Sequence, residues 1–351
     1  MSDYGHRITF GLSLYPSVDL LDETKQLAQA ADAAGLDYLA IQDHAYNPDF
    51  LDVWTLITYL AAGTDRISFF PDVADLQLRP PTILAKAAAS LSVLSGGRIV
   101  LGVGGGASAA GIAAMGGALR NGREMVAFTD EALKIMRQAL VGGVVELRGS
   151  QLTIGDYAAG PVPPATVPLW LGSNGPQMLA VTGRSADGWI SPLSTYGTPP
   201  AVPARQRQID AAARSAGRDP AALRRIYNVV GAIGAVRGGP GLTGDVKSWI
   251  DTLTDWSVDL GFDTFIFWPT TGAPCPAQGL RHRGRSGRPP AGERTSRPTG
   301  RSYAMSTSPR EAAPTMPVSE DRDHLEDPPD ALVTLVEYGD YECPHSGAAR
   351  R

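Results

Sequence analysis

Asp43 and His44 are the residues whose types and position most directly suggest chemistry in this chain. They end the stretch YLAIQDH (38–44), whose apolar half reads as a buried strand. A neutral imidazole can take or give a proton near physiological pH, and a neighbouring carboxylate can orient it or raise its pKa. The pair therefore predicts acid/base chemistry at the end of a strand. The alternative is a solvated surface loop with a capping aspartate.

Three glycines, Gly104, Gly105 and Gly106, end a second strand-like stretch, RIVLGVGGG (98–106). A backbone without side chains allows a flat ring or a pyrophosphate-like group to lie against it. The glycines therefore predict a ligand-facing loop, with a flexible connection into the next helix as the alternative.

A third group of residues has the composition of a phosphate site. Gly172, Ser173, Asn174 and Gly175 follow the strand-like PLWL, and Pro176 then occupies the favoured first position of a helix. Free backbone N–H groups at the helix start, together with a hydroxyl and an amide side chain, suit an anion. The alternative is a well-capped helix that binds nothing.

The stretch ISFFPDVADLQLRPP (67–81) places Asp72, Val73 and Ala74 directly after another strand-like run. The two prolines that close it suit a helix entry. We expect a backbone irregularity between this strand and the helix.

These groups need a scaffold that brings strand ends together. The strand-like segments alternate with alanine- and leucine-rich stretches of helical spacing, and they cover residues 8–14, 37–43, 67–73, 98–104, 168–173, 187–193, 227–234 and 263–269. Eight such repeats predict a parallel (β/α)8 TIM barrel, whose active site lies at the carboxyl ends of the strands. A doubly wound sheet is the alternative, and the lack of early phosphate-fingerprint glycines disfavours it.

The composition of the chain indicates which class of ligand to expect and in which cellular compartment the protein works. The formal charge of −5 over 351 residues suggests neither a nucleic-acid partner nor an anionic membrane surface, so we expect a small-molecule substrate. The chain has only two cysteines, and it shows no leader-like start, no long apolar run and no metal-binding motif. We expect a cytoplasmic protein without a metal.

In combination, these motifs resemble the bacterial luciferase-like family of flavin- and deazaflavin-dependent oxidoreductases. The resemblance covers residues 7 to about 268, and it is carried by the DH pair, by LSVLSGGRIVLGVGGG (91–106), and by PLWLGSNGP (168–176) with ADGWI (186–190). It implies a luciferase-like TIM barrel that binds coenzyme F420, a deazaflavin, or alternatively FMN at its mouth. It also implies a possible homodimer, because members of the family often pair through barrel helices.

The resemblance also implies a role for each group of residues. Asp43 and His44 match the ring-proximal pair, and His44 matches the acid/base proposed for a deazaflavin-dependent sugar-phosphate dehydrogenase branch. Asp72, Val73 and Ala74 fall where many members have a bulge with a non-proline cis peptide against the ring. Gly104, Gly105 and Gly106 match the loop beside the cofactor, and the phosphate-binding turn corresponds to Gly172, Ser173, Asn174, Gly175 and Pro176.

The predicted activity is hydride transfer between a small organic substrate and the deazaflavin, with His44 as the catalytic residue. Ala107 stands where the sugar-phosphate dehydrogenases have a glutamate, which disfavours that substrate. The alternatives are an FMN-dependent monooxygenase and a non-catalytic flavin-binding barrel. An aldolase- or isomerase-like phosphate binder would need a lysine or glutamate at a strand end, and no strand offers one.

The sequence changes character after the barrel, which we assign to residues 1–271. Residues 272–331 are rich in Pro and Gly, basic and then acidic, and we expect them to be disordered. The barrel would then have an atypical or missing eighth helix. Residues 332–351 resemble the truncated start of a DsbA-type thioredoxin-fold protein, although Ser346 replaces the second cysteine of its redox motif.

Overall fold

The structure is a computed structural model that describes residues 4–195, 197–234 and 241–270. These residues belong to one compact unit, Met1–Thr270. The region where the eighth barrel helix was expected to be atypical or missing lies outside the described residues, as do the Pro- and Gly-rich segment and the DsbA-like fragment.

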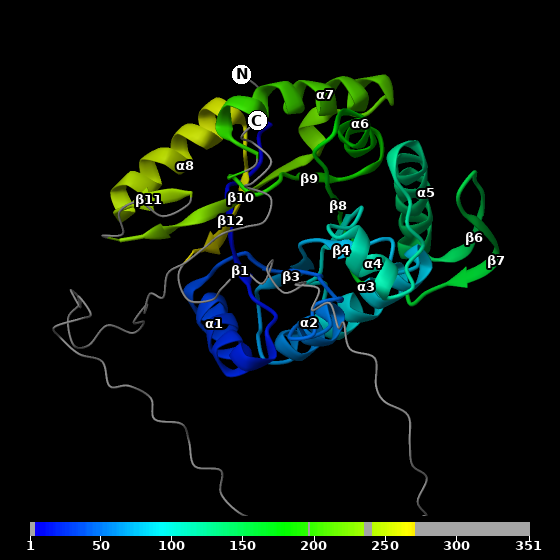
Figure 1. The fold of residues 1–351 in the computed structure, drawn as a ribbon, viewed down its shortest axis with the longest axis horizontal. Helices are drawn as coiled ribbons and strands as arrows, with labels where there is room; N and C mark the ends of the chain where they lie inside the picture. Colours follow the sequence, from blue (N-terminus) through cyan, green and yellow to red (C-terminus); the bar gives the residue numbers. More distant parts are fainter. Residues whose placement is uncertain (1–3, 196, 235–240, 271–351) are drawn as a thin grey trace, which may run out of the picture. The chain divides into compact units, whose positions relative to one another are not determined.

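A parallel barrel forms the centre of the unit (Figure 1). Its strands are β1 (Thr9–Leu14), β2 (Tyr38–Ile41), β3 (Ser68–Pro71), β4 (Ala74–Asp75), β5 (Leu101–Gly104), β8 (Leu169–Gly172), β9 (Gly188–Ile190), β10 (Arg224–Ile233) and β12 (Thr264–Pro269). They are hydrogen-bonded in the order β3-β2-β1-β12-β10-β9-β8-β5-β4. A parallel bridge between Phe69 and Ile99 also joins β3 to the residues that lead into β5. The predicted TIM barrel is therefore confirmed, with β3 and β4 as two parts of its third strand.

Helices lie between these strands, with both α4 and α5 after β5. They are α1 (Leu21–Ala34), α2 (Val53–Ala61), α3 (Pro81–Ser95), α4 (Ala109–Ala114), α5 (Gly122–Val141), α6 (Pro176–Ser185), α7 (Val202–Ser215) and α8 (Val246–Leu260). Gly35 ends α1 and Gly96 ends α3, both in the left-handed conformation that a glycine adopts without strain. A short strand, β11 (Leu242–Gly244), pairs with β10 before α8 begins.

The antiparallel hairpin of β6 (Gly143–Arg148) and β7 (Thr153–Ala159) was missed by the sequence patterns. It projects beyond α5 in Figure 1. Its strands are largely exposed, and their pairing is interrupted by a register shift between Val145 and Leu147, so their periodicity is weak. Glu131 of α5 fixes its turn by accepting hydrogen bonds from the backbone N–H groups of residues 150–152.

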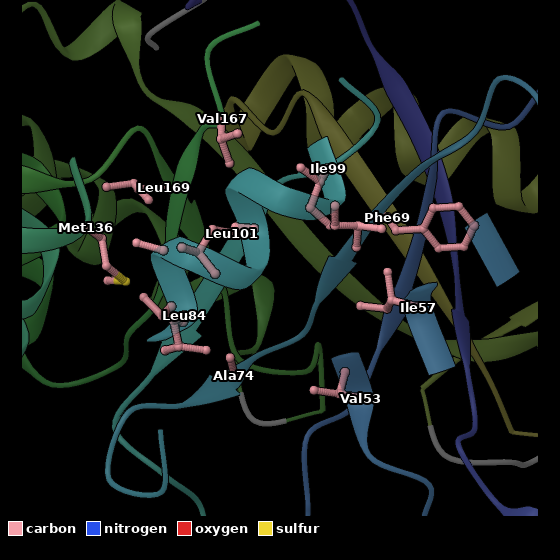
Figure 2. Packing of buried hydrophobic residues seen from close by; sticks show 14 of the residues in the cluster. Val53, Ile57, Phe69, Ala74, Leu84, Ile99, Leu101, Met136, Val167 and Leu169 are labelled. Atoms are coloured by element: carbon pink, nitrogen blue, oxygen red, sulfur yellow. The ribbon is translucent and has the colours of Figure 1, made fainter. Parts of the chain in front are cut away.

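The largest apolar core lies between the outer faces of the strands and the helices that cover them. Figure 2 shows Leu84 of α3 and Met136 of α5 among the outward-facing side chains of the strands. Side chains of the helices and of the outer strand faces pack tightly together in this core. This packing fixes the positions of the strand ends.

A second apolar layer fills the barrel interior. Its buried residues are Ala40, Phe70, Val100, Trp170, Ile190, Ile226 and Ile266, each from a different strand or strand entry. Since side chains alternate between the inside and the outside of a barrel, the residues two positions later on these strands face the interior one layer higher. That higher layer is the floor of the mouth, by which we mean the residues at and after the carboxyl ends of the strands.

Candidate active site

Polar side chains replace apolar ones at the floor of the mouth. Alternation from the apolar layer assigns Gln42, Asp72, Asn228 and Trp268 to this level, on β10 and β12 or directly after β2 and β3. Asn228 and Asp72 touch: the Asn228 amide donates a hydrogen bond of 3.4 Å to Asp72 Oδ1. At the floor of the mouth, hydrogen-bonding side chains therefore replace the apolar packing of the layer below.

His44 lies two residues after Gln42, in the segment that follows β2. Its Nδ1 lies 2.7 Å from the Tyr46 hydroxyl, and its ring also lies near Phe50. Burial lowers the pKa of His44, and this effect outweighs the opposite effect of the Asp43 charge. His44 is thus an uncharged imidazole at neutral pH, with one nitrogen occupied by Tyr46.

The Asp43 carboxylate is bound by protein groups, whereas the sequence predicted a place for it beside a cofactor. Its buried carboxylate accepts two hydrogen bonds of 2.8 Å from Arg79 and one from the Asp75 N–H. Arg79 also pairs with Asp52, the N-cap of α2, at 2.7 Å. Asp43 therefore fixes the loops around His44, and its effect on a ligand is indirect.

The predicted irregularity after β3 is a cis peptide bond between Asp72 and Val73. The Val73 side chain lies between the ends of β5 and β8, and glycines on both strands make room for it. A Cβ atom at Gly104 would lie 2.4 Å from Val73 Cγ2, and one at Gly172 would lie 3.1 Å from Val73 Cγ1. These two glycines thus hold Val73 in place, and the expectation that they face a ligand directly is not supported by their contacts.

The remaining glycines of that loop also pack against protein atoms. A Cβ at Gly105 would meet Met125 at 3.1 Å, and one at Gly106 would meet Ile112 at 2.5 Å. Gly106 also has a φ of 88°, which other residues rarely adopt. The glycines therefore act mainly by permitting close packing at the mouth.

We predict that Gly104→Ala destabilises the fold by about 1–3 kcal/mol, because the new methyl group collides with Val73. Urea unfolding measures the loss, and adding Val73→Ala should recover part of it. Gly175→Ala is the matched control, since nothing lies within 4 Å of its Cβ position. Equal losses for Gly104→Ala and Gly175→Ala would contradict this assignment.

The start of α6 is open, as the sequence predicted, but Ser173 contributes less than expected. Its hydroxyl pairs with Thr182 at 2.8 Å, and its carbonyl accepts the indole N–H of Trp189. Asn174, Gly175 and Pro176 are exposed, and within the described chain no side chain caps this helix at Gly175. Free N–H groups of the first turn are therefore available to an anion.

Three enclosed polar atoms at the floor of the mouth have no hydrogen-bond partner among the described residues: Asp72 Oδ2, Asn228 Oδ1 and Trp268 Nε1. Native proteins pair almost all such atoms, so a cluster of them is unusual. The cluster offers acceptors and one donor to a bound polar molecule. Sequence reasoning found Asp72 but missed Tyr46, which lies shortly after β2, and Asn228, which lies within β10 and has no local sequence signal.

A cavity of about 450 Å³ lies at the opposite end of the barrel, among Arg7, Thr9, Asp37, Tyr38 and neighbouring residues at the starts of the strands. Active sites of this fold lie at the carboxyl ends of the strands, so the cavity does not compete with the mouth as a candidate. Within the described ranges, no cluster of His, Cys, Asp and Glu could hold a metal ion. No described helix is both long and apolar enough to cross a membrane.

Comparison with known proteins relates this geometry to a family. The sequence profile described as luciferase-like monooxygenase matches residues 4–236. A 5,10-methylenetetrahydromethanopterin reductase of Methanolobus tindarius is 32% identical over 61% of this chain and 62% of the relative. The chain thus spans about three fifths of the length of that relative.

Solved structures support the fold at lower identity. The coenzyme F420 dependent tetrahydromethanopterin reductase from Methanopyrus kandleri superposes with a TM-score of 0.66 at 20% identity, covering 76% of this chain and 94% of the other. An F420-dependent secondary alcohol dehydrogenase in complex with an F420-acetone adduct gives a TM-score of 0.65 at 16% identity, covering 75% and 94%.

Proposed function

Because the chain belongs to the luciferase-like monooxygenase family, we propose that it is an oxidoreductase that binds coenzyme F420 at the mouth and acts on a small organic substrate. Relatives named for F420-dependent reduction and alcohol oxidation support the deazaflavin. The observation that carries the proposal is the set of unpartnered polar atoms of Asp72, Asn228 and Trp268 on the floor of the mouth.

The residues present fit such a cofactor. The floor offers hydrogen-bond acceptors and a donor to a polar ring edge, and the uncapped start of α6 offers N–H groups to a phosphate. Asn174, Gly175 and the N–H groups after Pro176 would hold that phosphate. The bound deazaflavin would supply or accept a hydride.

His44 would move the proton that accompanies the hydride. Because burial lowers its pKa, the imidazole is uncharged and can accept a proton from a substrate hydroxyl or amine. When Nδ1–H donates to the Tyr46 oxygen, Nε2 is the free acceptor. Tyr46 therefore orients the ring, and burial raises its own pKa to about 12, so that it keeps its proton.

Fluorescence titration of the purified protein with coenzyme F420 and with FMN tests the cofactor. We expect saturable binding of the deazaflavin and weaker binding of FMN. Preferential binding of FMN, with oxygen consumption on reduction, would favour the monooxygenase alternative, which the family description supports. Cofactor binding without turnover of any substrate would favour a non-catalytic barrel.

The phosphate site gives a sharper prediction through Gly175. The backbone angles of Gly175 suit any residue, and its Cβ position is open, so Gly175→Asp should cap α6 without strain. The carboxylate would occupy the free N–H groups and repel a phosphate, and we expect the cofactor Kd to rise by at least about tenfold while the melting temperature is retained. Gly175→Asn is the uncharged control and should weaken binding less. An unchanged Kd for Gly175→Asp would rule out this phosphate site.

A further inference from the structure

Asp72 is a carboxyl group at the mouth, and it has no role in the proton transfer proposed above. The register of β2 and β3 pairs Ile41 with Pro71, so Asp72 lies beside Gln42. His44 follows two residues later, in the segment after β2. Asp72 and His44 therefore both lie at the mouth.

The surroundings of Asp72 suit a neutral acid and not a carboxylate. Its Oδ2 is enclosed without a partner, and its Oδ1 accepts one long hydrogen bond of 3.4 Å from Asn228. An enclosed charge with so little compensation is costly. The Asn228 amide oxygen is also enclosed and without a partner in the described chain. A proton on Asp72, donated to that oxygen, would satisfy both groups at once.

No described cation stabilises a negative charge on Asp72. Of the neighbouring titratable groups, Asp43 is paired with Arg79, Asp75 is a second buried acid, and His44 is uncharged. The strands β5, β8, β9 and β12 contain no titratable residue, and those of β10 precede Asn228. Burial therefore dominates and raises the pKa of Asp72 to about 7, although the Asn228 hydrogen bond lowers it.

We propose that Asp72 carries a proton up to about neutral pH and shares it with Asn228, so that the floor of the mouth is uncharged where the cofactor would lie. This inference rests on the proposed function, in which His44 moves the proton that accompanies the hydride.

Infrared spectroscopy of the cofactor-free protein tests the protonation state directly. We expect the carbonyl stretch of a protonated carboxylic acid at pH 6, its loss as the pH rises through about 7, and its absence in Asp72→Asn. Asp255→Asn, which removes an exposed carboxyl group of α8, is the control and should keep the band. Asn228→Ala should shift this transition, because it removes both the amide N–H that donates to Asp72 Oδ1 and the amide oxygen that would accept the Asp72 proton.

Stability against pH provides a second readout. The pKa of Asp72 is about 7 when folded, against an ordinary value of 3.8, so the folded protein holds a proton that the unfolded chain has released between these values. The stability of wild type relative to Asp72→Asn is therefore greatest at low pH and falls as the pH rises through 7. Melting temperatures at pH 5 and pH 8 measure this difference.

An infrared band that is absent from wild type, or that persists in Asp72→Asn, would overturn the inference. If Asp72→Asn fails to fold, the infrared titrations of wild type and Asn228→Ala decide it alone. Because these need no cofactor, their failure is distinct from failure of the proposed function, which cofactor titration reports.

Discussion

Replacing His44 by alanine should lower the turnover of a bound substrate by about 10²- to 10⁴-fold, the range that a positioned acid/base group contributes. The cofactor Kd should change little, because His44 is assigned to proton movement and not to the phosphate. Steady-state kinetics and fluorescence titration measure the two effects separately.

Tyr46→Phe is the matched control for His44→Ala. It removes the hydroxyl that lies 2.7 Å from His44 Nδ1 but keeps the ring, so we expect a smaller loss of kcat. Because burial lowers the pKa of His44 below its usual 6.5, the acidic limb of the wild-type rate profile should lie below pH 6.5. Full turnover by His44→Ala would remove the acid/base assignment.

Replacing Arg79 by methionine should destabilise the fold by about 3–5 kcal/mol, because it leaves the buried Asp43 carboxylate without its cation. The Asp43 side chain is 1% exposed and that of Arg79 is 19% exposed, so solvent screens the pair only weakly. Urea unfolding at pH 7 measures the change in the free energy of unfolding.

The double variant Asp43→Asn with Arg79→Met serves as the control for this pair. Removing both charges should recover part of the loss, since the uncompensated carboxylate is then absent. A loss below about 1 kcal/mol for Arg79→Met would instead match an exposed ion pair and contradict the burial of Asp43.

The barrel was predictable because its strands are short apolar runs and its helices carry caps and spacing that agree with them. RIVLGVG, for example, contains the whole of β5, and Gly96 ends α3 as expected. The hairpin of β6 and β7 was not predictable in this way, because exposed strands outside the core have no strong alternation. It depends on contacts such as those of Glu131, which lies about twenty residues away.

The sequence predicted where the site lies, at the carboxyl ends of the strands. It did not predict which way the side chains there point. Asp43 and His44 both follow the end of β2, and the sequence alone does not show that Arg79 binds Asp43. Likewise, Gly104 reads equally well as a ligand contact or as space for another side chain. Only the path of the chain at Asp72-Val73 shows that Val73 fills that space.

Asn228 illustrates what a single sequence cannot show. It lies 156 residues from Asp72, and nothing in its local sequence distinguishes it from an asparagine of the core. Its role depends on barrel closure, which brings β10 across the interior from β3. Contacts of this kind depend on the fold, and local patterns carry no signal for them.

A crystal structure of the protein with bound coenzyme F420 tests the central claim most directly. The account predicts the deazaflavin ring between His44 and the Asp72-Val73 peptide, with the phosphate on the N–H groups at the start of α6. A cofactor bound elsewhere, or a mouth filled by the protein's own side chains under saturating cofactor, would contradict it.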